Sequence, residues 1–595
     1  MNSFKRLFSY IKPYKFKFSI SMLFSIIYTF TRTSQPFLIG LAISQVAKDV
    51  SNGNKINLNY ISIIVLLLII TSTLDTLGDY LSNYLLADVV QKSMKDIRND
   101  INYKINLLPV SYFDKHKQGD LLNKITTDVD VLGNALQQGV LKILSSILIL
   151  VFSVVFMYIR SPFFAIISII IFPICFFVYK FLYKKSMALF IRLQNLLGDL
   201  NAYTTEYLSA YEVIQLFGQE KQVTDDFKKI NSKIDSVGFK CNFTASLSNP
   251  ILSHIVHLAY IGLFIVVSIT ALGKPLYIGG FMVAKGIDVG GLQSFIQYVW
   301  QSSGPIQDIT QLSNVFQAAI ASWKRVIDFL DETEEKLENL PVPTNLENVE
   351  GNISFKHIAF GYSKDNLLMK DVNINVRSGQ KIAVVGATGA GKTTLINLLM
   401  RYYDLNGGSI TIDGIEMNKF TKEQSRSLFG LVLQDPWLYH DTIANNIKFG
   451  NLDATNEEII EAAKIANVDY YINTLPQGYE TILNEESSNI SQGQKQLITI
   501  ARALVKNPKI LILDEATSSV DTRLEVLIQK AMENAMKNRT SFVIAHRLST
   551  IRNADLILVM SNGSIVEQGN HEELLNINGV YKELYESQFS TGVVE

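Results

Sequence analysis

Long apolar stretches in the first half of the chain constrain its fold more than any other feature. A transmembrane helix needs about 20 mainly apolar residues. Five stretches qualify and a sixth is more polar; they span 18–46, 60–86, 137–159, 162–183, 250–272 and, as the polar one, 289–312. Charged residues make up 18% of the 595-residue chain and gather mainly outside these stretches. We therefore predict an all-α transmembrane domain with six spans at residues 1–330.

The basic amino end and the connections between spans indicate how the domain is oriented. Residues 1–17 carry five basic side chains and no acidic one, and no small-residue cleavage site follows. Basic flanks favour the cytoplasm, so we expect an uncleaved first span with its amino end inside the cell. The long, charged connections 87–136 and 184–249 then also lie inside. We expect them to be helices that extend beyond the bilayer, with turns near 108–119 and 209–218.

The first two apolar stretches each contain an ionisable residue well inside the span. Arg32 in the first span and Asp75 in the second lie at similar distances from the outer ends of their spans. Charges inside a membrane are usually paired or face a cavity, so we predict that Arg32 and Asp75 form a pair. The pair could fix helix packing, or its members could also contact a polar or charged substrate. The sixth stretch contains several glutamines and is expected to line a cavity rather than face lipid.

The second half of the chain has a different pattern. Residues 331–350 are acidic, contain two prolines and are predicted to be a linker. From residue 351 short β-forming runs alternate with helical stretches; the runs are 353–355, 381–385, 510–513, 541–544 and 556–559. This alternation is typical of a largely parallel sheet with crossover helices. We predict an α/β nucleotide-binding domain at 351–587 and a short tail at 588–595.

A complete phosphate-binding loop follows the apolar run 381–385. Its residues are Gly386, Ala387, Thr388, Gly389, Ala390, Gly391, Lys392, Thr393 and Thr394. The glycines allow backbone N–H groups to surround phosphates at a helix amino end. Lys392 would add charge-assisted hydrogen bonds and the Thr393 hydroxyl would bind Mg²⁺. The strand–loop–helix context makes a chance glycine turn improbable, so we expect ATP and Mg²⁺ here.

Two acidic residues follow the apolar run 510–513. Asp514 and Glu515 would lie at the carboxyl end of a central strand, which is where such sheets bind their ligands. We predict that Asp514 holds Mg²⁺ through water and that Glu515 polarises the attacking water. Surface acids after a strand are common, but the phosphate-binding loop upstream favours the catalytic interpretation.

Residues 351–587 resemble the nucleotide-binding domain of an ATP-binding cassette protein, and the whole chain resembles an exporter half-transporter. In Phe-Gly-Tyr, Tyr362 resembles the aromatic residue that stacks on adenine. In Val-Leu-Gln-Asp-Pro, Gln434 resembles the glutamine that contacts Mg²⁺ and links to the membrane half. In Ile-Ala-His-Arg, His546 resembles the histidine that contacts the γ-phosphate. Asp521 matches the loop that crosses to the opposite site.

One part of the family pattern is altered. The usual Leu-Ser-Gly-Gly-Gln signature is Ile490 followed by Ser491, Gln492, Gly493 and Gln494. In this family the signature of one chain closes over the ATP held by the other, so a dimer is implied. Gln492 adds bulk and removes backbone freedom at the place of a glycine. An altered signature beside an intact Glu515 resembles one subunit of heterodimeric bacterial exporters, whose partner has the usual signature and lacks the glutamate. A homodimer is the alternative.

The resemblance implies ATP-driven export of amphipathic small molecules, drugs or lipids across a bacterial plasma membrane. Membrane lipid and a second half-transporter are the implied partners. A homodimeric lipid or peptide exporter and a non-transporting membrane sensor remain alternatives. We expect no nucleic-acid partner, because the net charge is −1 and no dense basic patch with interleaved aromatic residues occurs.

Overall fold

The computed structural model describes the chain apart from a set of short segments. These are residues 1, 161, 248–249, 252, 256, 259–260, 263, 266–275, 279–280, 285–287, 336–348, 364–365, 485–488, 515–521, 546–547 and 590–595. The chain divides into two compact units. Unit 1 contains Met1–Leu108 and His116–Thr333, and unit 2 contains Pro109–Lys115 and Glu334–Glu595.

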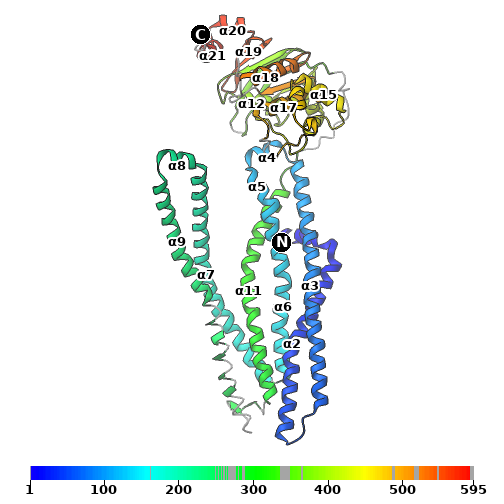
Figure 1. Ribbon diagram of the computed structural model, residues 1–595, viewed down its shortest axis with the longest axis vertical. Coiled ribbons are helices and arrows are strands. Elements are labelled where there is room, and N and C mark those ends of the chain that lie inside the picture. The colour runs from blue at the N-terminus through cyan, green and yellow to red at the C-terminus, as the bar shows by residue number, and fades with distance from the viewer. Residues whose placement is uncertain are drawn as a thin grey trace. The chain divides into compact units, whose positions relative to one another are not determined.

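Unit 1 is built from long helices together with a few short ones (Figure 1). They are α1 (Asn2–Ile11), α2 (Lys15–Ser51), α3 (Leu58–Leu107), α5 (Gln118–Asn123), α6 (Val129–Arg160), α7 (Pro162–Ser209), α8 (Tyr211–Phe217), α9 (Glu220–Ser246) and α11 (Val289–Leu330). A turn of 3-10 helix (Lys12–Tyr14) joins α1 to α2, and a π-helical turn (Lys124–Asp128) joins α5 to α6. The predicted extension of helices past the apolar stretches is confirmed, because α3 continues to Leu107 and α7 to Ser209.

Two regions of the described chain are long and apolar enough to cross a membrane, Leu58–Leu107 and Gln118–Arg160. The predicted fifth span, 250–272, falls partly outside the described residues. The count of six spans therefore stays a prediction. The predicted external connection 273–288 contains a short antiparallel hairpin, β1 (Leu276–Ile278) and β2 (Phe281–Ala284), which the sequence pattern did not indicate.

Helices α2 and α11 pack closely because small residues lie at their contact. A Cβ atom added to Gly290 would lie 2.0 Å from the carbonyl oxygen of Gly40, and one added to Gly40 would lie 2.6 Å from that of Gly290. Ser294 on α11 donates a hydrogen bond to the Pro36 carbonyl oxygen of α2 at 2.8 Å. Small residues spaced four apart are a common way for membrane helices to approach each other.

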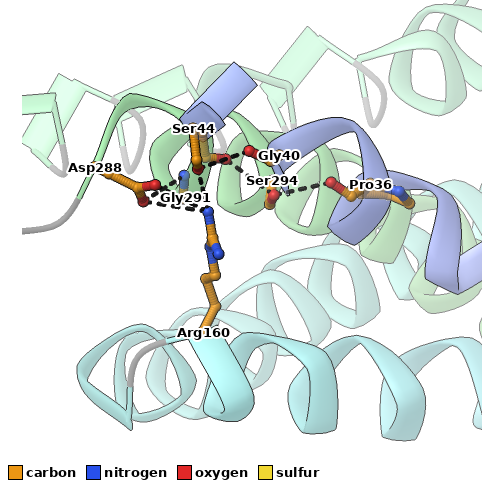
Figure 2. Close-up of polar contacts among 8 residues, drawn as sticks. Pro36, Gly40, Ser44, Arg160, Asp288, Gly291 and Ser294 are labelled. Carbon is orange, nitrogen blue, oxygen red and sulfur yellow. Dashed lines mark hydrogen bonds and ion pairs between the residues drawn. The ribbon is translucent and has the colours of Figure 1, made fainter. Parts of the chain in front are cut away.

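Arg160 joins this contact from the end of α6, as Figure 2 shows. Its guanidinium donates to the Ser44 hydroxyl on α2 and to Asp288, with Nη2 lying 3.1 Å from Asp288 Oδ2. Asp288 also caps α11, because its Oδ1 accepts a hydrogen bond from the Gly291 N–H at 3.0 Å. Three helices that are far apart in the sequence are thus joined at one place.

We expect Gly290→Val to destabilise unit 1 by about 3 kcal/mol, because overpacking a tight contact forces backbone shifts. The measurement is the thermal unfolding midpoint of the purified protein in detergent. Gly304→Val is the matched control, since Gly304 lies on the same helix and a Cβ added there meets nothing within 4 Å. Equal midpoints for the two variants would contradict the prediction.

The predicted pair of Arg32 and Asp75 stays a prediction. Among the described residues no salt bridge or hydrogen bond joins the two side chains, but their charges are near enough to interact. Both side chains line one cavity of about 730 Å³ between α2, α3 and α11, with Asp79, Gln297 and Gln301. Periodicity along single helices placed both groups at one level but could not fix the distance between them. The expectation that the polar sixth stretch lines a cavity is confirmed for Gln297 and Gln301.

Unit 2 contains a six-stranded sheet in the order β12–β11–β5–β10–β9–β8. The strands are β5 (Lys381–Val385), β8 (Phe429–Val432), β9 (Ile510–Asp514), β10 (Thr540–Ile544), β11 (Leu556–Ser561) and β12 (Ser564–Gly569). β12 pairs antiparallel with β11, and the other neighbours pair in parallel. Central strands β9 and β10 are buried along almost their whole length, as parallel strands covered on both faces require.

A separate antiparallel sheet was not predicted. Its order is β4–β3–β6–β7, formed by β3 (Ile353–Phe360), β4 (Met369–Val376), β6 (Gly407–Ile412) and β7 (Ile415–Glu416). The predicted run 353–355 belongs to this sheet, so its assignment to the parallel sheet was wrong. In β4 buried and exposed residues alternate, which is typical of a sheet with one covered face.

Unit 2 also contains helices, several of which are labelled in Figure 1. They are α12 (Lys392–Leu399), α13 (Lys422–Ser427), α14 (Ile443–Lys448), α15 (Asn456–Ile465), α16 (Asp469–Thr474), α17 (Gln492–Val505), α18 (Thr522–Met536), α19 (Leu548–Arg552), α20 (His571–Ile577) and α21 (Val580–Phe589). Short helix α4 (Val110–Lys115) also belongs to this unit, although the chain on either side of it belongs to unit 1.

The predicted linker and tail lie mostly outside the described residues. At the start of the linker, Glu335 belongs to unit 2, where its carboxylate accepts a hydrogen bond from Arg426 at 2.8 Å and lies 3.1 Å from Lys422 Nζ. Burial raises the pKa of Glu335, but these two cations outweigh that effect and leave the pKa below its usual value. The last described helix, α21, extends to Phe589, two residues past the predicted domain end.

Candidate nucleotide-binding site

The phosphate-binding loop joins buried strand β5 to helix α12, as predicted. All three of its glycines have φ values that other residues rarely adopt, with Gly389 at 84°. Gly386 has φ 149° and an added Cβ would lie 2.3 Å from the Met560 carbonyl oxygen of the neighbouring strand β11. Gly391, at the amino end of α12, has φ 104°. These values belong to the region that favours glycine, and a glycine-rich turn at a helix amino end is suited to bind phosphates through its backbone N–H groups.

Lys392 is the first residue of α12 and its ammonium group lies over the loop. Nζ donates to the carbonyl oxygens of Gly386 at 2.6 Å and Ala387 at 3.2 Å. Burial lowers the pKa of Lys392, and the nearby carboxylate of Asp514 partly opposes this. The side chain is therefore a desolvated cation placed beside the turn of backbone that would hold phosphates.

Tyr362 lies at the edge of the same loop. Its hydroxyl makes a 2.9 Å hydrogen bond with the Thr394 hydroxyl, and its ring packs edge to face against Phe360 and Tyr403 at centroid distances of 5.2 and 5.1 Å. Half of its surface remains exposed. A ring held on two sides with one face open is suited to stack on a planar base.

These groups line one open cavity of about 480 Å³. Its walls comprise Tyr362, Leu368, Thr388, Gly389, Gly391, Lys392, Thr393, Thr394, Gln434, Asp514 and Ile544. Nine of the predicted residues are thus brought together by the fold. The remaining loop residues, Gly386, Ala387 and Ala390, belong to the same turn but are not among the lining residues.

The donor atoms fit a magnesium ion bound together with phosphates. The Thr393 hydroxyl, the Gln434 amide oxygen and the Asp514 carboxylate are all oxygen ligands, which Mg²⁺ prefers. Mg²⁺ normally completes its shell with water and substrate phosphates, so a few protein oxygens suffice. Asp514 is the last residue of β9 and pairs with Ile544 of β10, which places it at the carboxyl edge of the sheet as expected.

Three predicted residues cannot be placed. Glu515 and Asp521 fall in 515–521, and His546 falls in 546–547, outside the described residues. Their roles stay predictions.

The altered signature begins helix α17. Ser491 is the N-cap: its hydroxyl accepts a hydrogen bond from the Gln494 N–H at 3.3 Å, and the Gln494 side chain accepts one from the Ser491 N–H at 2.8 Å. This reciprocal capping satisfies two N–H groups of the first turn. Gln492 is exposed and Gly493 is buried. None of the four residues lines the cavity around Lys392.

A residue that sequence reasoning missed extends the aromatic cluster toward α4. Tyr403 packs against Tyr362, and its hydroxyl donates a hydrogen bond to the Asp114 carboxylate of α4. Burial raises the pKa of Tyr403, and the bond to Asp114 raises it further, so the phenol stays protonated at neutral pH. No motif marks Tyr403 or Asp114, since they meet only through folding of residues 289 positions apart.

Comparisons with known proteins agree with this geometry. The profile of the ABC transporter transmembrane region matches residues 18–304, and the ABC transporter profile matches residues 369–518. A fatty acid ABC transporter ATP-binding/permease protein of Mycobacterium bovis is 42% identical over 496 residues, which are 83% of this chain and 76% of the relative.

This chain belongs to the ABC transporter family.

Another relative and a solved structure extend the similarity over almost the whole ABC transporter chain. An ATP-dependent lipid A-core flippase of Syntrophus aciditrophicus is 33% identical over 593 residues, covering 99% of this chain and 95% of the relative. The structure of a bacterial Atm1-family ABC exporter with ATP bound has a TM-score of 0.75 and 26% identity, covering 97% of this chain and 99% of that one.

Membership of the family establishes the general activity of the chain. The chain is an ATP-hydrolysing membrane transporter of exporter architecture, with the transmembrane region and the ATPase fused in one polypeptide. It uses ATP with Mg²⁺. ABC transporters act as dimers, because each ATP is enclosed between two nucleotide-binding domains.

We expect Tyr403→Phe to leave ATP affinity unchanged within about twofold and to reduce stimulation of the ABC transporter's ATPase by transported substrate. The variant keeps the ring that supports Tyr362 but loses the bond to Asp114. The measurement is ATPase rate with and without substrate in nanodiscs. Tyr470→Phe, at a hydroxyl exposed on α16, is the control. Full stimulation in Tyr403→Phe would show that the bond to Asp114 is not needed for coupling.

Proposed function

We propose that this chain is the hydrolytic subunit of a heterodimeric exporter of lipid-like amphiphiles. It would act in a bacterial plasma membrane, with its amino end and ATPase in the cytoplasm. The observation that carries an amphiphile substrate is the cavity between α2, α3 and α11, where ionic groups such as Arg32 lie beside apolar Ile39 and Ile296. The relatives named for fatty acid and lipid A-core transport support the same class of substrate.

Each nucleotide-site residue has a proposed role. Tyr362 stacks on adenine; the loop N–H groups and Lys392 hold phosphates; Thr393, Gln434 and, through water, Asp514 hold Mg²⁺. The metal supplies charge neutralisation on the phosphates. Glu515 accepts a proton from the attacking water, and His546 contacts the γ-phosphate. Closing of two nucleotide-binding domains on ATP would turn the cavity outward, and hydrolysis would reset it.

The heterodimer rests on the signature at α17. Ser491 and Gly493 retain the elements that could close over a partner's ATP, but exposed Gln492 adds a long side chain where a backbone approach is required. The signature belongs to the opposite site, so it would slow hydrolysis of the partner's ATP. The site built on Lys392 and Asp514 would receive the intact signature of the partner and hydrolyse its own ATP. Asp521 would lie in the loop that crosses between the two sites.

Co-expression tests the proposed function. We expect the purified chain alone to turn over ATP poorly, and the chain with the product of its neighbouring transporter gene to form a 1:1 complex that moves lipid between leaflets of a vesicle. Gln492→Gly in that complex should raise turnover at the second site. A stable, transport-active homodimer of this chain would refute the heterodimer. No ATP-dependent movement of any lipid by either preparation would refute the substrate class.

A further inference from the structure

The cavity between α2, α3 and α11 has a charge pattern of its own. Arg32 contributes one positive charge, and Asp75 and Asp79 contribute one negative charge each, so the formal sum is 1 − 2 = −1. Asp75 and Asp79 lie four residues apart on α3 and therefore share a face. Trp300, Gln297 and Gln301 of α11 also line the cavity. The cavity thus presents both cationic and anionic groups.

The charges interact within the described part of the chain, since Arg32 and Asp75 attract each other, but no salt bridge joins them. Arg32 has no ion pair or hydrogen bond there. Asp79 accepts one hydrogen bond, from the Asn83 amide at 2.8 Å. Ionised groups at membrane depth are costly unless they are paired or perform a function. A ligand that supplied the opposite charges would relieve that cost.

The hydrogen-bonding groups of the cavity favour a ligand whose cationic group also donates hydrogen bonds. The Gln301 Oε1 atom is buried and has no hydrogen-bond partner among the described residues. Trp300 is 57% exposed beside it, and an indole face attracts alkylammonium groups. The planar guanidinium of Arg32 in the same cavity matches the oxygens of a phosphate or carboxylate.

We propose that this cavity binds the zwitterionic headgroup of an amphiphile, with its anionic group on Arg32 and its ammonium beside Asp75, Asp79 and Gln301. The inference rests on the proposed function and specifies its substrate class. A purely anionic amphiphile would be repelled by the two carboxylates, and a purely cationic one by Arg32. A zwitterion satisfies both sides.

Binding of matched single-chain lipids tests the proposal. The complete transporter, with its partner subunit if it requires one, is placed in nanodiscs of phosphatidylglycerol, and each lipid displaces a fluorescent lysolipid. The probes share one acyl chain length: lysophosphatidylethanolamine, lysophosphatidylcholine, lysophosphatidic acid, the free fatty acid and the alkylamine. We expect lysophosphatidylethanolamine to bind at least about tenfold more tightly than the last three, since each charge-assisted contact contributes about that much. Lysophosphatidylcholine, which has no N–H donor for Gln301, should bind between them.

Substitutions separate the two sides of the cavity. Arg32→Gln should weaken the binding of lysophosphatidylethanolamine about tenfold and strengthen the binding of the alkylamine. Asp75→Asn should weaken the binding of lysophosphatidylethanolamine and strengthen that of lysophosphatidic acid. Arg32→Lys, which keeps the charge, should restore most of the binding. Arg192→Gln on α7 and Asp235→Asn on α9 are charge-matched controls at exposed positions away from the cavity. Monodisperse elution of every variant excludes misfolding.

The outcomes are distinct. Tighter binding of the fatty acid or of lysophosphatidic acid than of both zwitterions would overturn the zwitterion proposal while leaving lipid export intact. The zwitterion proposal would also be overturned if Arg32→Gln and Asp75→Asn changed the affinities for all probes equally. If no lipid bound or was moved, the proposed function itself would fail.

Discussion

Glu515→Gln is expected to lower ATP hydrolysis by the assembled transporter about 10²- to 10⁴-fold, while ATP binding is retained. The reason is the position of Asp514, whose carboxylate ends β9 beside Lys392 and Thr393 in the nucleotide cavity. Glu515 follows Asp514 directly in the chain and is therefore the acidic residue nearest to it in sequence. Glutamine has the same size and keeps the hydrogen-bonding shape, but it cannot take a proton from water. The measurement is steady-state phosphate release together with equilibrium binding of a fluorescent ATP analogue.

Glu461→Gln is the matched control for that experiment. Glu461 is an exposed glutamate of α15, and the same change of charge there should leave both measurements unchanged. A loss of less than about tenfold in Glu515→Gln would mean that another group accepts the proton. In a heterodimer, the partner's ATP site would still hydrolyse ATP slowly. That residual rate is the lowest rate that the assay can show for Glu515→Gln.

Lys392→Ala is expected to weaken ATP binding at this chain's site about 10- to 100-fold. The Lys392 ammonium is the cationic side chain of the cavity wall, and it is already desolvated by burial, so its bonds to phosphate oxygens are charge-assisted and little screened. Adenosine, which has no phosphates, should bind both proteins equally. Equilibrium titration of the intact transporter with ATP and with adenosine provides the comparison.

Lys381→Ala controls for loss of a lysine near the same strand. Lys381 begins β5 at the end opposite the phosphate-binding loop, and its backbone N–H bonds to Asp555, a contact that the substitution keeps. The ATP affinity of the Lys381→Ala variant should equal that of the unaltered protein. Loss of affinity for adenosine in Lys392→Ala would mean that the loop had unfolded rather than lost one contact.

Local patterns predicted much of the fold. The apolar stretches marked the long helices, and the buried runs at 381–385, 510–513 and 541–544 marked the central parallel strands. The phosphate-binding loop and Asp514 were predicted because strand, loop and helix are consecutive in the chain. Nine predicted residues therefore meet in one cavity. Such features depend on neighbours in sequence, and periodicity or motif spacing records them directly.

Features that depend on contacts between distant segments were not predicted. The antiparallel sheet pairs Ile353 of β3 with Ile412 of β6, and nothing in either short run specifies that partner. The pairing of Arg32 with Asp75 stays a prediction for the same reason, because depth along two helices does not fix the distance between them. The bond from Tyr403 to Asp114 and the contact of Gly40 with Gly290 likewise exist only in the folded chain.

Helix α4 has a practical consequence for biochemistry on this transporter. Because Pro109–Lys115 packs with Glu334–Glu595, the polypeptide passes between the two units three times rather than once. A soluble ATPase fragment starting at residue 351 would lack Asp114 and leave the Tyr403 hydroxyl without that acceptor. Rates measured on such a fragment would describe an ATPase that lacks part of its own compact unit. The acidic linker is therefore the wrong place to divide this protein. An ATPase fragment that also carries residues 109–115, joined through a short linker, would keep this contact.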